Sequence, residues 1–172
     1  MNVIKKGMSF ILAFLFVFYA FAIEKTESQE TRITIVCIGD SHFESGSPLT
    51  WFLQNELGRD YRIISAGRRG WTTGAWRRNI HIWRYMIRRG DAVLISLGGN
   101  DISNHIDPLT TEANLRYLFE AIPIDIPVRR ITRPNNVLPP LELGRDHIHL
   151  TRSGARDYAH RLVPIILEMF NH

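Results

Sequence analysis

The sequence contains a single cysteine, Cys37, which excludes a disulfide within the chain. Cys37 lies inside an apolar run, where a small core side chain is expected. The sequence has no low-complexity tract, and its composition of 45% hydrophobic and 22% charged residues is that of an ordinary globular protein. A length of 172 residues therefore predicts one domain.

Long apolar runs are also scarce. The one candidate, residues 8–23, follows Lys5 and Lys6 and ends in the small-x-small pattern Ala20-Phe21-Ala22. Its sixteen residues fall short of the roughly 20 that span a bilayer. This pattern predicts a signal peptide at residues 1–22, a flexible leader at 23–30 and a folded domain at 31–172. The mature protein is then secreted or periplasmic and has no stable membrane span, whereas an uncleaved anchor helix is the alternative.

Net charge is small as well. The chain carries +4, which falls to +2 when the two lysines of residues 1–22 are removed. This charge is too low to favour a nucleic-acid partner. Within the helix expected at 74–89, the arginines at 77, 84 and 88 share one face, opposite two tryptophans and two isoleucines. We interpret this as a solvated face opposite a core face, with an anionic polymer or envelope surface as the alternative ligand.

Alternating strand and helix patterns predict the fold class. Apolar, β-branched runs typical of buried strands occupy 33–38, 61–64 and 91–97. Helical periodicity is found at 48–57, 74–89, 111–121 and 152–170, with a kink expected at Pro164. We expect an α/β protein, a three-layer α/β/α sandwich around a parallel sheet of four to five strands. Its site should lie at the carboxyl ends of the strands.

All three of these strands end in polar, glycine-rich turns, and the second runs into Gly67 and Gly70. Gly39-Asp40-Ser41-His42 follows the first strand and presents a serine hydroxyl near a helix amino end, whose N–H groups stabilise developing negative charge. Gly98-Gly99-Asn100-Asp101 follows the third, and Asn100 offers an uncharged amide donor. Each pattern alone is also that of an ordinary turn.

A third polar segment, Asp146-His147-Ile148-His149, precedes the last helix. The spacing of three lets the Asp146 carboxylate accept the Nδ1 proton of His149 within one local turn. That bond orients the ring and leaves Nε2 free as a base. Ser41, His149 and Asp146 thus supply the nucleophile, base and orienting group of an acyl-transfer site.

Four blocks in this order closely resemble the SGNH (GDSL-type) hydrolase family. They are IGDSH at 38–42, SAGRRGWTT at 65–73, SLGGND at 96–101 and DHIHLTRSG at 146–154. The resemblance implies a flavodoxin-like SGNH hydrolase fold and a serine esterase with catalytic residues Ser41, Asp146 and His149. It implies an oxyanion hole from the N–H groups of Ser41 and Gly70 and the amide of Asn100, with Gly67 competing for the glycine role. It implies no cofactor and no metal.

The chain departs from the family pattern in two places. Only 44 residues separate Asp101 from Asp146, where members of the family usually have another strand and helix, so the sheet is expected to be shortened to four strands or irregular at one edge. Arg68 and Arg69 form a basic pair inside the second block. This pair would favour anionic substrates or would simply form a solvated turn.

Three functions are compatible with these residues. The leading one is hydrolysis of carboxylic esters by a monomer, on O-acetyl groups of glycans or peptidoglycan or on lipid or short acyl esters. The alternative is a catalytically inactive SGNH-fold module that binds acylated glycans. The third is a metal-dependent hydrolase with ligands from Asp40, His42, Asp101, His147 and His149.

Processing of the amino terminus can be measured directly. We expect the mature protein to begin at or near Ile23, because cleavage follows the small-x-small pattern that ends at Ala22. Mass spectrometry of exported protein gives the mass of its first peptide. Exported protein that retains Met1 would contradict the signal-peptide interpretation.

Overall fold

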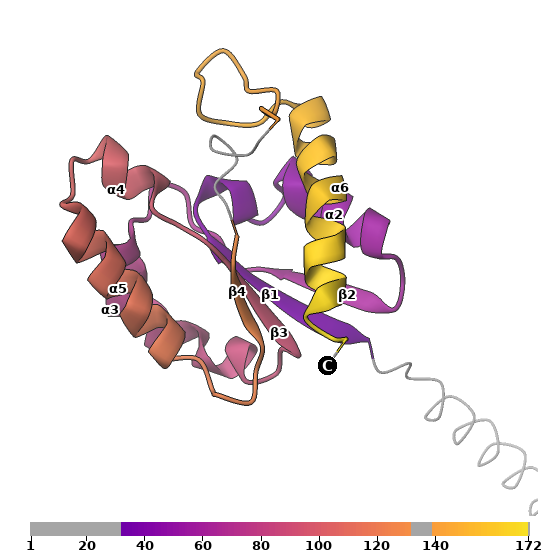
Figure 1. Ribbon diagram of the computed structural model, residues 1–172, viewed down its shortest axis with the longest axis horizontal. Coiled ribbons are helices and arrows are strands. Elements are labelled where there is room, and N and C mark those ends of the chain that lie inside the picture. The colour runs from indigo at the N-terminus through magenta and orange to yellow at the C-terminus, as the bar shows by residue number, and fades with distance from the viewer. Residues whose placement is uncertain (1–31, 132–138, 172) are drawn as a thin grey trace, which may run out of the picture. The chain divides into compact units, whose positions relative to one another are not determined.

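The structure, a computed structural model, describes residues 32–131 and 139–171; the predicted signal peptide and leader lie outside these residues. Its centre is a parallel sheet in the order β2-β1-β3-β4 (Figure 1). The strands are β1 (Ile33–Gly39), β2 (Tyr61–Ser65), β3 (Ala92–Ser96) and β4 (Val128–Arg130). The described sheet therefore has the smaller of the two expected numbers of strands.

Helices cover both faces of the sheet (Figure 1). Helices α2 (Pro48–Leu57) and α6 (Arg152–Glu168) pack together on one face, and α3 (Thr73–Ile87) and α5 (Pro108–Glu120) pack together on the other. The short helices η1 (Ser41–Phe43) and α4 (Gly99–Ser103) follow β1 and β3. This arrangement confirms the predicted three-layer α/β/α sandwich. Among the described residues, no helix is long and apolar enough to cross a bilayer.

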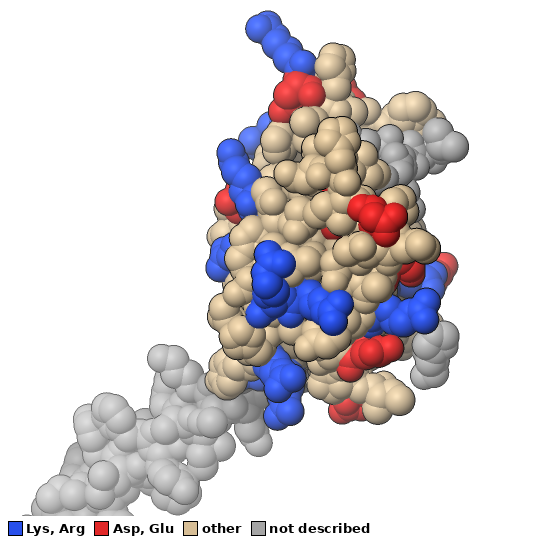
Figure 2. All heavy atoms as spheres, turned by 90° about the vertical axis from the view of Figure 1, so that its left-hand side faces the viewer, with Lys and Arg blue, Asp and Glu red and all other residues tan. Residues whose placement is uncertain are grey.

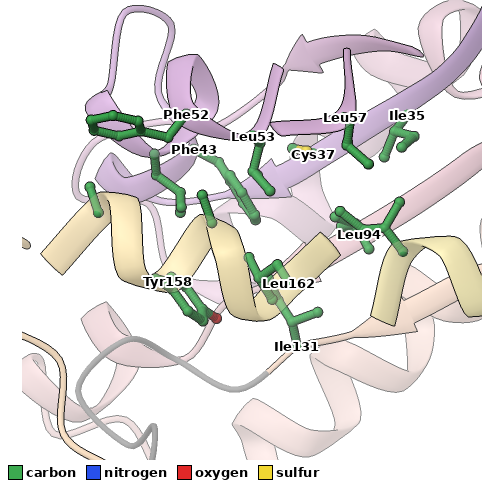
Figure 3. Close-up of a cluster of buried hydrophobic side chains, with 14 of the residues drawn as sticks. Ile35, Cys37, Phe43, Phe52, Leu53, Leu57, Leu94, Ile131, Tyr158 and Leu162 are labelled. Carbon is green, nitrogen blue, oxygen red and sulfur yellow. The ribbon is translucent and has the colours of Figure 1, made fainter. Parts of the chain in front are cut away.

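Side chains of β1 alternate between two hydrophobic cores. Ile35 and Cys37 face the core of α2 and α6 (Figure 3), whereas Val36 and Ile38 face the core of α3 and α5. All four are fully buried, as expected for a strand covered on both sides. Burial also raises the pKa of the Cys37 thiol. The predicted place of Cys37 in the core is confirmed.

The amphipathic character of α3 is confirmed. Its buried residues include the two tryptophans and two isoleucines predicted for the core face, Trp76, Ile80, Trp83 and Ile87. Arg77, Arg84 and Arg88 are exposed. On the side of the molecule that Figure 2 presents, basic groups are interspersed with acidic and uncharged ones. The arginines therefore form a solvated helix face, as interpreted from the sequence.

Polar caps fix the helix ends near the predicted positions. Ser47 caps the amino end of α2, and Gly58 follows its last residue with a φ of 78°, a left-handed conformation that favours glycine. Thr151 caps α6, whose helical conformation continues through Pro164. The helix that the sequence placed at 111–121 begins three residues earlier, because Asp107 caps α5 ahead of Pro108.

The fourth strand lies in the segment where the family resemblance suggested an irregular edge. Val128 pairs with Val93 in parallel, and the Pro127 carbonyl accepts a hydrogen bond from the Val93 N–H at 2.9 Å. β4 forms one edge of the described sheet. Its residues Arg129 and Arg130 are exposed and pair with Glu168 and Glu112, respectively.

The start of α6 gives a test of packing. A Cβ atom on Gly154 would lie 2.0 Å from the carbonyl oxygen of Glu142, so Gly154→Ala should destabilise the protein by about 1–3 kcal/mol. The matched control is Gly74→Ala in the first turn of α3, where the nearest atom lies 3.4 Å from the added carbon. This control should be neutral or stabilising by up to about 1 kcal/mol. Urea denaturation of both variants measures the difference, and equal effects would contradict the packing argument.

Candidate active site

The turn after β1 is held by several backbone contacts. The Gly39 carbonyl accepts hydrogen bonds from the Arg68 N–H at 3.0 Å and from Trp76 Nε1 at 2.8 Å. A Cβ atom on Gly39 would lie 2.7 Å from the ring of Phe43, so glycine is needed for this close approach. Ser41 follows at the start of η1. The serine is thereby presented at the carboxyl edge of the central strand.

A loop before α6 carries Asp146 and His149. The Gly144 N–H donates to the His149 carbonyl at 2.7 Å, and the Thr151 N–H donates to the Glu142 carbonyl at 3.1 Å. Thr151 also caps α6. We call residues 142–151 the DxxH loop. Together with the antiparallel bridge between Leu143 and Leu150, these bonds fix the backbone of His149 just before α6.

The structure brings the three predicted triad residues together. His149 Nδ1 lies 2.6 Å from Asp146 Oδ2, and His149 Nε2 lies 3.0 Å from Ser41 Oγ. Asp146 Oδ1 accepts two further hydrogen bonds at 3.0 Å, from the N–H groups of Ile148 and His149. A continuous hydrogen-bonded chain therefore runs from the serine hydroxyl to the carboxylate.

Hydrogen bonds to Asp146 favour the ionised form of its carboxyl group. The side chain of His149, followed by the two backbone N–H groups, lowers the pKa of the Asp146 carboxyl well below its usual range. The ionised carboxylate accepts the Nδ1 proton, so Nε2 is the acceptor for the serine hydroxyl. The side chains of His149 and Asp146 are 47% and 48% exposed, which leaves the triad open to solvent.

His147 occupies a different position from His149. It is exposed and has a φ of 56°, in the left-handed region that ordinary residues rarely adopt. Its N–H donates to the Gly144 carbonyl at 2.9 Å. This left-handed turn lies between Asp146 and His149, whose side chains contact each other.

The two candidate glycines of the oxyanion hole differ in their hydrogen bonding. The Gly67 N–H donates to the Phe43 carbonyl at 3.0 Å, so it is already engaged. A Cβ atom on Gly67 would also lie 2.2 Å from the Phe43 backbone, which gives this glycine a packing role. Gly70 has a φ of 73° and lies on an exposed turn, where an added Cβ atom would meet no other atom within 4 Å. Gly70 is therefore the better candidate donor.

Asn100 lies beside the Gly70 turn. Its Nδ2 donates to the carbonyl of Trp71 at 3.0 Å, which uses one of its two amide hydrogens. Among the described residues, the other hydrogen meets no acceptor. Gly98, with a φ of 105°, makes the sharp turn from β3 into α4 that places Asn100 there.

Asp101 has a structural role that the sequence interpretation missed. Its carboxylate is fully buried and accepts hydrogen bonds from the Thr73 N–H at 2.9 Å and from Thr111 Oγ1 at 3.3 Å. It thus stabilises the amino end of α3 and fixes the turn that carries Asn100. The signal in the sequence was Thr73 at a predicted helix start, where backbone N–H groups need an acceptor.

The five residues considered as metal ligands are not gathered at one point. Asp101 is bound to Thr73 and Thr111, while His149 faces Ser41 and Asp146. In the described part of the chain, no three or more side chains of His, Cys, Asp or Glu are arranged as a metal site.

The basic pair beside the site has partners within the protein. Arg69 Nε lies 3.2 Å from Glu44 Oε2 on the surface. The guanidinium of Arg68 lies over the ring of Trp83, 4.7 Å from its centroid. These contacts favour the solvated-turn interpretation over recognition of an anionic substrate.

Asp40 and His42 form a second acid–histidine pair next to the triad. Asp40 Oδ1 accepts hydrogen bonds from the His42 N–H at 3.1 Å and from His42 Nδ1 at 2.9 Å. Burial alone would raise the pKa of Asp40, but the hydrogen bonds and charge of His42, with a smaller contribution from His149, lower it below its usual value. Asp40 is therefore a buried carboxylate.

A cavity of about 570 Å³ lies beside α2. Its lining includes Ser47, Trp51 and Arg152 but none of the triad residues. This cavity therefore does not enclose Ser41, which is itself partly buried.

Several solved structures share this fold. A crystal structure of TesA matches with a TM-score of 0.63 at 18% identity, over 79% of this chain and 99% of TesA. The psychrotrophic esterase EstA from Pseudoalteromonas, inhibited by monoethylphosphonate, matches with a TM-score of 0.57 at 18% identity, over 79% and 99%. A structure described as a lipolytic protein of the G-D-S-L family from Desulfitobacterium hafniense matches with a TM-score of 0.55 at 15% identity, over 76% of this chain and 99% of that protein.

No model of a known protein family matches the chain, and no curated protein matches its sequence. At these low identities the structural likeness shows a shared fold. The SGNH hydrolase fold expected from the four sequence blocks is thereby confirmed.

The lowered pKa of Asp40 predicts a pH dependence of stability. A depressed carboxyl pKa stabilises the folded state above the unfolded value of about 4, and this contribution is lost as the pH falls through the folded value. We therefore expect the difference in unfolding free energy between the wild type and Asp40→Asn to narrow below about pH 4. Urea denaturation between pH 7 and pH 2.5 measures it. Asp146 is present in both proteins and its contribution cancels, so a constant difference would refute this account of Asp40.

Proposed function

We propose that this protein is a serine hydrolase that cleaves carboxylic esters. Ser41 is the nucleophile, His149 is the general base and Asp146 orients and stabilises the imidazole. The observation that carries the proposal is the hydrogen-bonded chain from Ser41 Oγ through both ring nitrogens of His149 to Asp146, at 3.0 and 2.6 Å. These are the contacts by which a base activates a weak hydroxyl nucleophile.

The reaction proceeds in two half-reactions. Ser41 Oγ attacks the ester carbonyl carbon while His149 Nε2 takes the hydroxyl proton. The tetrahedral intermediate then collapses, and Nε2 gives the proton to the departing alcohol oxygen, which leaves an acyl-enzyme. Water attacks the acyl carbon with His149 again as base, and release of the carboxylic acid regenerates Ser41.

Negative charge on the former carbonyl oxygen needs donors that are fixed in advance. The Ser41 N–H, the Gly70 N–H and the free hydrogen of the Asn100 amide are proposed for this role. The bond from Asn100 to the Trp71 carbonyl supports it, because this bond holds the amide next to the Gly70 turn. One such donor typically contributes about 10²–10³ in kcat.

The openness of the site favours one class of ester. The side chains of His149 and Asp146 are nearly half exposed, and the lining of the cavity beside α2 does not include Ser41. A short acyl group on a bulky alcohol fits such a surface better than a long acyl chain, which gains its binding energy from an apolar tunnel. Together with the predicted export, this favours O-acetyl groups on envelope or extracellular glycans, including peptidoglycan.

The experiment is hydrolysis of p-nitrophenyl acetate by the wild type and Ser41→Ala. We expect the variant to lose activity with a nearly unchanged Tm, because the small hydroxyl of the partly buried Ser41 contributes little to packing. A fluorophosphonate probe should label only Ser41 of the wild type. Hydrolysis or labelling that persists in Ser41→Ala would refute the proposal. A folded wild type that is inactive but retains acetylated glycans would instead indicate the binding module.

His149 and His147 provide a matched pair of controls. His149→Ala should lower kcat/KM by about 10³ or more, as loss of a triad base does. His147→Ala should change it by less than about tenfold, because His149 is the histidine that reaches Ser41 Oγ. If the two variants exchange these effects, the proposed triad is wrong.

A further inference from the structure

His42 follows the proposed nucleophile directly, yet the mechanism above does not use it. Its side chain is only 9% exposed and projects from η1 between the Asp40 turn and the DxxH loop. The centroid of its ring lies 5.8 Å from that of His149. Buried polar groups normally form hydrogen bonds, so both ring nitrogens of His42 should have partners.

Both nitrogens of His42 face acceptors. Nδ1 lies 2.9 Å from Asp40 Oδ1, and Nε2 lies 3.2 Å from the backbone carbonyl oxygen of Ile148. A carboxylate and a carbonyl can only accept, so both contacts are hydrogen bonds only when both ring nitrogens carry a proton. In a neutral ring, one nitrogen lone pair would face an oxygen lone pair. The geometry therefore fits an imidazolium paired with the Asp40 carboxylate.

This ring connects two segments that are distant in sequence. Asp40 adjoins Ser41, whereas Ile148 is 106 residues away from His42 and adjoins His149. The bond from Nε2 to the Ile148 carbonyl thus holds the peptide unit that links Ile148 to His149. The opposite bond to Asp40 anchors the ring to the turn that carries Ser41.

We propose that His42 is a positioning residue that clamps the DxxH loop onto the nucleophile turn. The clamp fixes the backbone of His149 and so maintains the 3.0 Å contact between His149 Nε2 and Ser41 Oγ. The inference rests on the proposed function. Such a contact is needed because the ring of His149 is 47% exposed and receives little support from packing. A displacement of about 1 Å at a reacting pair can cost about 10² in rate.

Charged groups around His42 are consistent with this role. Asp40 balances its positive charge at 2.9 Å, so the charge does not strongly oppose protonation of His149 during the reaction. Asp146 contacts Nδ1 of His149 and stabilises that second cation. Tyr158 of α6 is also close enough to Asp40 for the carboxylate to add to the effect of burial in raising the tyrosine pKa.

Three substitutions separate the two bonds of the ring. His42→Leu removes both. The amide nitrogen of Asn falls near the position of Nδ1 and that of Gln near Nε2, so His42→Asn keeps a donor for Asp40 and His42→Gln keeps one for Ile148. With p-nitrophenyl acetate, we expect Leu and Asn to lower kcat by about 10² with KM changed less than about threefold. Gln should stay within about tenfold of the wild type.

A double-mutant cycle with His149 tests whether His42 acts through it. In the His149→Ala background, His42→Leu should cause no further loss, because there is no base left to position. An equal loss in both backgrounds, an unchanged kcat for His42→Leu, or rescue by Asn as complete as by Gln would each overturn the proposal. If His42→Leu does not fold, the kcat values of His42→Gln and His42→Asn still test the proposal. Persisting hydrolysis by Ser41→Ala would refute the proposed function instead.

Discussion

The site depends on the exit of β1 from the sheet. β1 pairs with strands on both sides and is fully buried along Ile35–Ile38, so its carboxyl end has little freedom to move. Three other parts of the chain contact this turn. The segment after β2 donates from the Arg68 N–H to the Gly39 carbonyl and from the Gly67 N–H to the Phe43 carbonyl. Trp76 of α3 also donates to the Gly39 carbonyl, and the Ile148 carbonyl of the DxxH loop contacts the His42 ring. Ser41 is held at the centre of these contacts. A nucleophile must approach the carbonyl carbon from a defined direction, so this rigidity favours the reaction of Ser41.

Much of the fold was predictable because its signals are local. Runs of β-branched residues marked three of the four described strands, and helical periodicity marked α2, α3, α5 and α6 to within a few residues. The parallel sheet covered on both faces followed from the alternation of strands and helices, whereas the strand order β2-β1-β3-β4 was not predicted. The contact between Asp146 and His149 was also predictable, since three residues of spacing allow it within one turn. Proximity of Ser41 to His149 required the family resemblance, because 108 residues separate them.

The remaining features were not predictable from local pattern. β4 has three residues, follows a proline and includes two exposed arginines, so no periodicity distinguishes it from a loop. The burial of Asp101 contradicts the usual preference of aspartate for the surface and depends on Thr73 reaching it from another helix. The bond between His42 and Ile148 depends on the backbone of a distant loop, which no side-chain pattern encodes.

The arginines of β4 also affect how the molecule behaves in a crowded compartment. An edge strand offers unpaired N–H and C=O groups on which a strand of another molecule can form a ladder. At this edge, Arg129 and Arg130 are solvated and each lies in an ion pair with a helix of the same chain. A second copy docking edge to edge would bring like charges together and break those pairs. The short, basic edge therefore opposes the growth of intermolecular sheets from this end of the described sheet.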